Sequence, residues 1–280
     1  MKKIKEYKNR VVDLIKKLLV INGKQEMRIL PGQIAFFLIL SIFPLITILV
    51  LFMSNFNFSI DAIFEFASKI MPEQIVNILE PYLHSNISTN LILTLVIGFF
   101  LASNGPHSII VASDTLYDLK GQSFFRTRLK AILMTIILLI VFVVMVIGLA
   151  FGNKIIKSLL AIGLFNGFGD EIYNIYVLFK WPVAFLLIFM CIKLLYTMAP
   201  DKQIPSYHVN KGSIFTTICW TIVTLIYSFY INNFSHYDLF YGSLANIIIL
   251  MIWIYIIAYI LVIGIAINSE VYKSSKKNNN

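Results

Sequence analysis

The sequence is poor in the residues from which soluble proteins build their surfaces. Charged residues make up only 13% of its 280 residues, whereas a soluble domain carries about 25%. Hydrophobic residues reach 59%, which is more than one water-soluble core of this size can bury. Lipid must therefore be the solvent for much of the surface, and the sequence predicts an integral membrane protein.

Motifs of catalytic and metal-binding sites are also missing. Cys191 and Cys219 lie inside apolar segments and form no CxxC pair, which disfavours a disulfide or a metal centre. The histidines are scattered without ligand spacing, at His84, His107, His208 and His236. No GxSxG, HExxH or P-loop motif occurs. We therefore expect no enzyme, no catalytic residues, no metal site and no cofactor.

Six apolar segments are each long enough to cross a hydrocarbon core about 30 Å thick. Their length and their lack of alternation favour helices over barrel strands. The expected fold class is all-α, a polytopic membrane protein with six transmembrane helices and further amphipathic interfacial helices. The expected spans are 31–53, 90–111, 129–151, 173–198, 213–233 and 244–267. The first follows a long charged segment, so we expect a retained helix and no cleavable signal peptide.

Basic residues alternate between the loops in phase with six spans. The segment before the first span holds nine Lys and Arg residues, whereas the loop 234–243 holds none. By the positive-inside rule both termini are cytoplasmic. The net charge of +9 lies in these loops, where anionic lipid headgroups account for it. We therefore expect membrane lipids as partners and no nucleic acid.

The segments outside the spans complete the expected organisation. A basic amphipathic helix over 1–28 suits the inner leaflet or the cytoplasmic ends of the bundle. The six-helix domain covers 29–270, and its first outer loop contains an amphipathic hairpin over 58–84 that Pro72 divides. The polar tail 271–280 is expected to be disordered.

Polar residues and helix breakers meet inside the second span. Asn104, Gly105, Pro106 and His107 follow one another there, flanked by Ser103 and Ser108. Proline removes a backbone donor and glycine weakens a helix. An unwound polar segment of this kind forms substrate sites in transporters. The alternative is a simple proline kink whose polar groups neighbouring helices satisfy.

Two carboxylates follow on the same helix, and they have two interpretations. Asp114 and Asp118 are spaced four residues apart, so they share one helix face near the cytoplasmic end. They either bind a cation or, as we favour, pair with nearby basic residues. The candidate partners are Arg126, Arg128 and Lys130.

Several segments together resemble the YihY/BrkB family of bacterial inner-membrane proteins, once labelled ribonuclease BN. The resemblance covers about residues 8–272. It is carried by Ala35–Leu45, Tyr117, Phe124–Leu129, Tyr196, Pro200, Gly212, Tyr241-Gly242-Ser243-Leu244, Trp253, Tyr255, Gly264 and Asn268. The family often has Glu where this chain has Ala266, and Glu270 lies one turn further on.

The resemblance implies six helices, a multi-pass location in the bacterial cytoplasmic membrane and roles in the cell envelope and in lipid handling. With the polar second span, it favours a transporter or flippase-like protein for an amphiphilic or lipid-linked envelope molecule, which can be anionic. The alternatives are a non-transporting membrane scaffold for envelope assembly and, ranked last, an intramembrane lipid-modifying enzyme. The ribonuclease label has no support in the residues, and an oligomer is compatible with them. The expected substrate-binding or gating residues are Asn104, Gly105, Pro106, His107, Asp114, Arg128, Tyr241, Gly242 and Ser243.

Overall fold

The computed structural model describes residues 25–55, 91–146, 169–234 and 244–278, together with Val20 and Gly23. Within these ranges the chain forms α-helices and no strand. In chain order they are α2 (Glu26–Asn55), α5 (Leu91–Ala102), α6 (Asn104–Leu116), α7 (Phe124–Val146), α9 (Gly169–Met198), α10 (Asn210–Phe234) and α12 (Leu244–Asn278). The prediction of an all-α fold is confirmed.

Five stretches of the described chain are long and apolar enough to span a membrane. They are Val96–Leu116, Phe124–Met145, Tyr173–Met198, Asn210–Tyr230 and Ile248–Lys276. These stretches correspond to the second to sixth expected spans, so the chain is a multi-pass membrane protein. The first expected span lies within α2, which is one uninterrupted helix of 30 residues despite Pro31 and Pro44. Its passage through the membrane stays a prediction.

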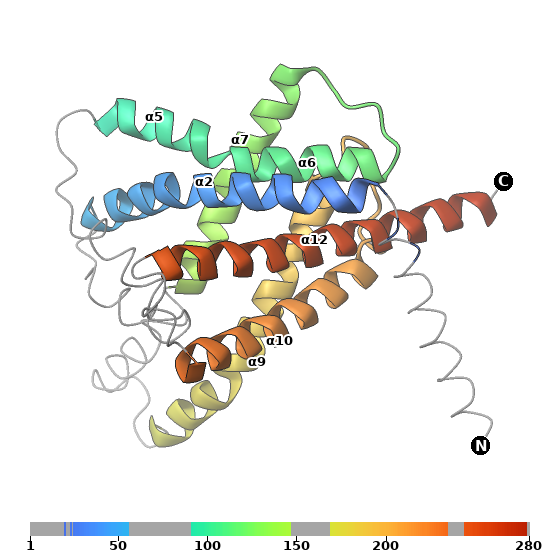
Figure 1. The fold of residues 1–280 in the computed structure, drawn as a ribbon. Helices are drawn as coiled ribbons and strands as arrows, with labels where there is room; N and C mark the ends of the chain where they lie inside the picture. The colour runs from blue at the N-terminus through green and yellow to red at the C-terminus, as the bar shows by residue number, and fades with distance from the viewer. Residues whose placement is uncertain are drawn as a thin grey trace, which may run out of the picture.

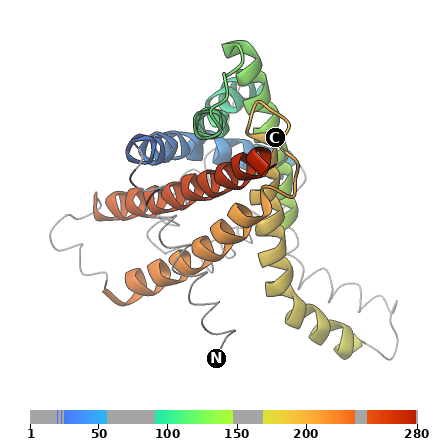
Figure 2. The ribbon, with the colours of Figure 1, turned by 90° about the vertical axis from the view of Figure 1, so that its right-hand side faces the viewer.

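Helices α2 and α12 lie side by side in the middle of the bundle (Figure 1). Helices α5 and α6 pack against α2, and α10 packs against α12. Helices α7 and α9 run steeply across the others and contact α6 and α10, respectively (Figure 2). The fully buried side chains between these helices include Met27, Ile34, Ile110, Met134, Leu261 and Ile265.

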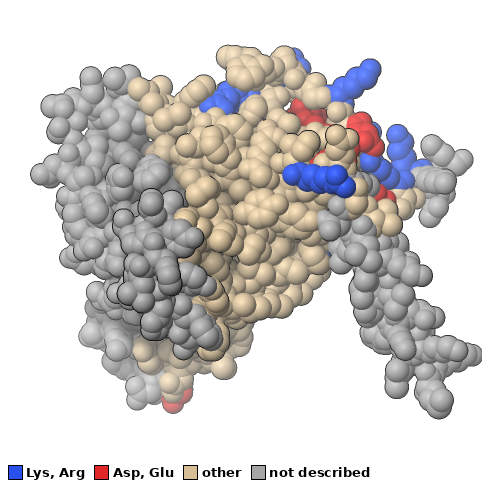
Figure 3. All heavy atoms as spheres, viewed as in Figure 1, with Lys and Arg blue, Asp and Glu red and all other residues tan. Residues whose placement is uncertain are grey.

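Most charged side chains visible in Figure 3 gather at one end of the bundle. Helices α2, α7 and α10 begin at this end, whereas α6, α9 and α12 end there (Figure 1). We call it the charged end. The loops α6–α7 and α9–α10 both lie at it, which brings together residues that are far apart in the sequence.

Two predicted boundaries differ from the structure. Helix α7 begins at Phe124, before the expected 129, because the Ser123 carbonyl already accepts a 3.1 Å bond from the Thr127 N–H. Helix α12 continues to Asn278, so the expectation of a disordered tail from 271 is wrong for the described residues. Ser269 and Lys273 both bond the Leu116 carbonyl on α6, which holds this end of α12 in place. The hairpin 58–84 and most of the segment 1–28 lie outside the described residues.

Candidate functional site

The second span is kinked and does not unwind. Helix α5 ends at Ala102 and α6 begins at Asn104, with Ser103 between them in helical conformation at φ −71° and ψ −5°. The Ser103 N–H bonds the Phe99 carbonyl at 3.0 Å, and the Ser103 carbonyl accepts from the His107 N–H at 2.9 Å. Pro106 has no N–H for the preceding turn, which explains an interruption at this place. Of the two interpretations of the polar segment, the backbone agrees with the kink.

Gly105 joins the kink to α2. Its N–H donates a 3.2 Å hydrogen bond to Oγ of Ser41, and the Ser41 hydroxyl donates in turn to the Phe37 carbonyl at 2.7 Å. A Cβ atom on Gly105 would lie 3.2 Å from Cδ2 of Leu38 and 3.4 Å from Ser41 Oγ. There is thus room for no more than a methyl group, and the close approach of the Leu38 and Ser41 side chains on α2 explains the glycine.

Arg128 on α7 holds the other side of the kink. Its Nη1 donates to Oδ1 of Asn104 at 2.9 Å, and its Nη2 donates to the Phe100 carbonyl at 2.5 Å. The guanidinium carbon lies 3.9 Å from the centre of the Phe100 ring, in a cation–π contact. We call Phe100, Asn104 and Arg128 the Arg128 cluster. The structure thus brings together two of the predicted site residues, Asn104 and Arg128.

The other predicted residues of the kink have local contacts. His107 is half-buried, and its ring packs edge-on against Phe124 with 6.2 Å between the ring centroids. Pro106 is buried on α6, and the Gly105 carbonyl accepts a 2.7 Å bond from the Ser108 hydroxyl. The predicted site residues Tyr241, Gly242 and Ser243 lie outside the described residues.

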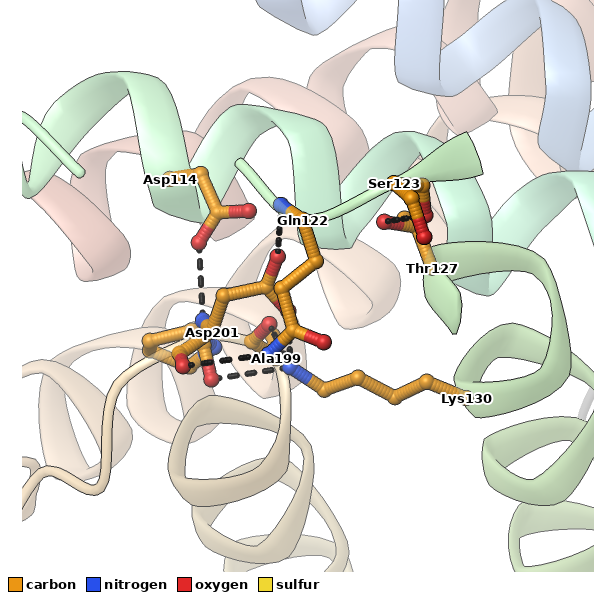
Figure 4. Close-up of polar contacts among 8 residues, drawn as sticks. Asp114, Gln122, Ser123, Thr127, Lys130, Ala199 and Asp201 are labelled. Carbon is orange, nitrogen blue, oxygen red and sulfur yellow. Dashed lines mark hydrogen bonds and ion pairs between the residues drawn. The ribbon is translucent and has the colours of Figure 1, made fainter. Parts of the chain in front are cut away.

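A second polar network closes the charged end around Asp201, in the α9–α10 loop (Figure 4). The Asp201 N–H donates to Oδ1 of Asp114 at 2.8 Å, and Oδ2 of Asp201 accepts from the Gln122 N–H at 2.9 Å. Lys130 donates 2.8 Å bonds to Oδ1 of Asp201 and to the carbonyls of Ala199 and Pro200. This Asp201 network ties α6, the start of α7 and the end of α9 to one another.

The electrostatics of Asp201 favour its charged form. The side chain is only 3% exposed, and burial alone would raise its pKa. The Lys130 ammonium and the Gln122 N–H outweigh burial and hold the pKa of Asp201 below its usual range. Lys130 also bonds the first two carbonyls after the C-terminus of α9, where a cation is favourable because of the helix dipole. The network is therefore strongest with Asp201 ionised.

The two carboxylates on α6 have different partners, and neither pairs with the arginines considered. Asp114 accepts from the backbone of Asp201, whereas Asp118 forms an ion pair with Lys273 on α12. Asp118 has a φ of 54°, in the left-handed region, so the chain leaves the helical path at this residue. Its carboxylate reaches Lys273 from there. Pairing with basic residues is thus seen for Asp118, although with a partner from the other end of the chain.

Two residues that carried the family resemblance, Tyr196 on α9 and Gly264 on α12, pack α9, α10 and α12 together. Tyr196 is buried, and its hydroxyl lies 2.7 Å from Oγ1 of Thr216 and donates to the Leu261 carbonyl at 2.9 Å. A Cβ atom on Gly264 would lie 2.2 Å from the Tyr196 hydroxyl, which only glycine avoids. These motif residues thus act in helix packing.

Two further positions of the resemblance have distinct surroundings. Tyr117 is 5% exposed, and its hydroxyl has no hydrogen-bond partner in the described part of the chain. Burial raises the pKa of Tyr117 far above its usual range. Ala266 is buried whereas Glu270 is exposed, so Glu270 does not take the buried place of the glutamate that is frequent in the family.

Sequence reasoning missed Asp201, Gln122 and Ser41 as site residues. Asp201 directly follows Pro200, in a loop that six alternating spans place on the same side as the α6–α7 loop. That topology could have pointed to Asp201 as a partner for Lys130. Ser41 had no signal of its own, because serine is frequent in membrane helices.

Comparison with known proteins finds relatives that match most of the chain. The model of a family described as "Virulence factor BrkB" matches residues 23–280. The ribonuclease-like protein YfkH of Bacillus subtilis is 28% identical over 250 residues, which cover 88% of this chain and 90% of that protein.

Shorter matches are found in proteins named only as membrane proteins. A UPF0761 membrane protein of Xanthomonas campestris is 31% identical over 33% of this chain and 22% of its own length. One of Idiomarina loihiensis is 31% identical over 35% of this chain and 34% of its own length. No solved structure matches. The predicted resemblance is confirmed, and this chain of membrane-spanning helices belongs to the virulence factor BrkB family.

Proposed function

We propose that this protein moves an amphiphilic, lipid-linked envelope molecule across the membrane. The observation that carries the proposal is the Arg128 cluster, which places a buried guanidinium against a helix kink inside an otherwise apolar bundle. Charged side chains inside membrane proteins are costly and generally serve function. A kink shared by α2, α6 and α7 is a place where such a bundle can open, since few backbone bonds must break there.

The Asp201 network supplies the closed gate in this proposal. It joins α6, α7 and α9 only through side chains and loop backbone, so these helices can separate without unfolding. The charged end carries the basic residues Arg28, Lys120, Arg126, Lys130, Lys202, Lys211, Lys273 and Lys276. By the positive-inside rule we assign this end to the cytoplasm. The network then closes the path on the cytoplasmic side.

Reconstitution into liposomes tests the proposal. A fluorescent phospholipid in the inner leaflet becomes accessible to a membrane-impermeant quencher when the protein moves it outward. We expect flux with the unmodified protein and a loss of most of it with Gly105→Leu, because the larger side chain meets Leu38 and Ser41. The matched control is Gly32→Leu, since nothing lies within 4 Å of a Cβ atom at Gly32. Flux equal to that of protein-free liposomes, or equal flux in both variants, would contradict the proposal.

A membrane scaffold is the second candidate, and the tight packing at the kink favours it. Gly105 already contacts α2 through Ser41, and the exposed faces of α7 and α9 carry large apolar side chains that a partner helix could cover. This function predicts specific crosslinks to other envelope proteins and no lipid movement. The liposome experiment therefore separates the two candidates.

An enzymatic function has less support in the geometry. It needs Asp114, Asp118 or His107 to meet other polar groups in one pocket. Asp114 bonds the Asp201 backbone, whereas Asp118 pairs with Lys273. His107 packs against Phe124 on α7. The three side chains thus have three separate sets of partners.

A further inference from the structure

Arg128 brings a full positive charge into the bundle without an acidic partner among the described residues. It is 8% exposed, and its partners are neutral: the Asn104 amide oxygen, the Phe100 carbonyl and the Phe100 ring. Its Nε atom is buried and has no hydrogen-bond partner in the part of the chain that the structure describes. The guanidinium is therefore only partly satisfied within the protein.

The free-energy cost of burying this charge is too high for a residue that only joins helices. Burying a charge without a countercharge costs far more than burying an apolar side chain of similar size. Lys130, two residues away on the same helix, shows the contrast, because the Asp201 carboxylate lies 2.8 Å from its ammonium group. The missing countercharge of Arg128 points to an anion that binds from outside the chain.

The geometry indicates the class of anion. Nη1 and Nη2 each hold a different oxygen, as they do when arginine binds an oxyanion. Nε is a third donor without an acceptor. One edge of the guanidinium, formed by Nε and one Nη or by Nη1 and Nη2, binds two oxygens of an oxyanion. A carboxylate uses both of its oxygens there, whereas a phosphate-type group keeps further oxygens for other donors. The first turn of α7 contains no acidic residue, so its free N–H groups add to the positive potential.

The surroundings of Arg128 suit the tail of such a molecule. Phe124, Phe125 and Leu129 stand in the same first turns of α7 and are 73%, 77% and 61% exposed. Large exposed apolar side chains on a membrane helix face lipid chains. A lipid whose anionic headgroup binds Arg128 would thus have its acyl chains beside an apolar surface.

We propose that Arg128 recognises the phosphate-type headgroup of an amphiphile, and that Asn104 and Phe100 are internal stand-ins for two of its oxygens. In the described conformation the Asn104 amide oxygen and the Phe100 carbonyl accept the hydrogen bonds of the guanidinium. When α7 moves away from the kink, the phosphate oxygens take their place on the guanidinium. This inference rests on the proposed function, for which it names the anionic end of the substrate.

Lipid binding to the full-length protein in detergent tests the inference. Phosphatidylglycerol is titrated into the protein, and native mass spectrometry measures the bound fraction. Diacylglycerol, which has the same acyl chains but no phosphate, is the comparison lipid. Arg128→Gln should weaken phosphatidylglycerol binding about tenfold or more, since it removes a charge-assisted bidentate contact. The matched control, Arg126→Gln, removes the same charge two residues away at an exposed position and should change binding less than about twofold.

Asn104→Ala distinguishes recognition from a merely structural contact. It removes the internal competitor, so binding of phosphatidylglycerol should become about threefold tighter or more. Weaker binding with Asn104→Ala, equal losses with Arg126→Gln and Arg128→Gln, or diacylglycerol binding as tight as phosphatidylglycerol would each overturn the inference. If Arg128→Gln does not fold, the Asn104→Ala result decides.

Inorganic phosphate identifies the source of the anion. Competition by phosphate alone supports a site that also accepts a soluble anion, whereas binding that persists at high phosphate supports a lipid headgroup. The result is also separable from the proposed function. Arg128-dependent binding without flux in liposomes would retain the inference and reject transport, and flux that is indifferent to Arg128 would do the reverse.

Discussion

The Gly212 N–H on α10 donates a 2.7 Å hydrogen bond to Oδ1 of Asn268 on α12. A Cβ atom on Gly212 would lie 2.2 Å from the Gly264 carbonyl oxygen and 2.5 Å from Asn268 Nδ2. The two helices therefore touch through their backbones, as membrane helices do at small residues. The position needs glycine because of this approach and not because of its backbone angles.

Gly264→Ala should destabilise the bundle strongly. The new methyl group would lie 2.1 Å from Thr216 Oγ1 and 2.2 Å from the Tyr196 hydroxyl, so a helix must shift. Overpacking of this kind costs about 1–3 kcal/mol or more. We expect a clearly lower Tm in detergent, measured by intrinsic fluorescence. Gly32→Ala is the control and should leave Tm unchanged or slightly higher, and equal Tm values for the two variants would refute the packing model.

The stability of the protein should fall at acidic pH through Asp201. Its pKa is lower in the folded state, so its charged form contributes stability above the unfolded pKa. That contribution is lost as the pH falls below about 4, through the folded pKa. Asp201→Asn should lower Tm at neutral pH and flatten this acid dependence.

Glu171→Gln, at the exposed start of α9, is the matched control for Asp201→Asn and should follow the unmodified protein. Measuring Tm from about pH 7 to about pH 3.5 gives all three profiles. An Asp201→Asn profile parallel to that of the unmodified protein would show that Asp201 does not carry the effect.

Ser41→Ala should weaken the contact between α2 and the kink. It leaves the buried Gly105 N–H without its acceptor, which costs about 1–3 kcal/mol. Thr115→Ala is a suitable control, since it removes a hydroxyl that bonds only the Val111 carbonyl of its own helix at an exposed position. We expect Tm to fall for Ser41→Ala and to stay near that of the unmodified protein for Thr115→Ala. A larger loss for Thr115→Ala would speak against the role of Ser41.

Asp118→Gly should be tolerated, whereas Asp118→Val should not. Glycine adopts the φ of 54° at this position without strain, but a β-branched residue does not. The ion pair with Lys273 is exposed, and such pairs contribute only about 0–1 kcal/mol. Tm should therefore stay equal or rise for glycine and fall for valine. Similar losses for both would show that the carboxylate matters more than the backbone.

The helical architecture follows from the sequence because hydropathy and length determine it locally. The spans expected at 173–198 and 213–233 agree with α9 and α10 to within a few residues. Pro106 located the interruption, which falls at Ser103 because proline removes a bond of the preceding turn.

Contacts between helices could not be predicted in the same way. Asn104 and Arg128 were each expected at a site, but a single sequence does not show which helix faces meet. The Lys130–Asp201 pair spans 71 residues of chain, and Asp201 has an ordinary loop sequence around it. The glycine at 264 was known from the resemblance alone, and its reason became visible only with the Tyr196 hydroxyl beside it.

The hydroxyl of Ser41 restricts how the protein can move. Its proton is committed to the Phe37 carbonyl, and its oxygen accepts the Gly105 N–H from a second helix. Axial sliding of α6 along α2 would break this contact. The Ser41 contact therefore couples the position of α6 to that of α2. In the proposed transport cycle, opening would then come from α7 and α9 swinging away from α2 and α6, with the α6–α7 loop as the hinge.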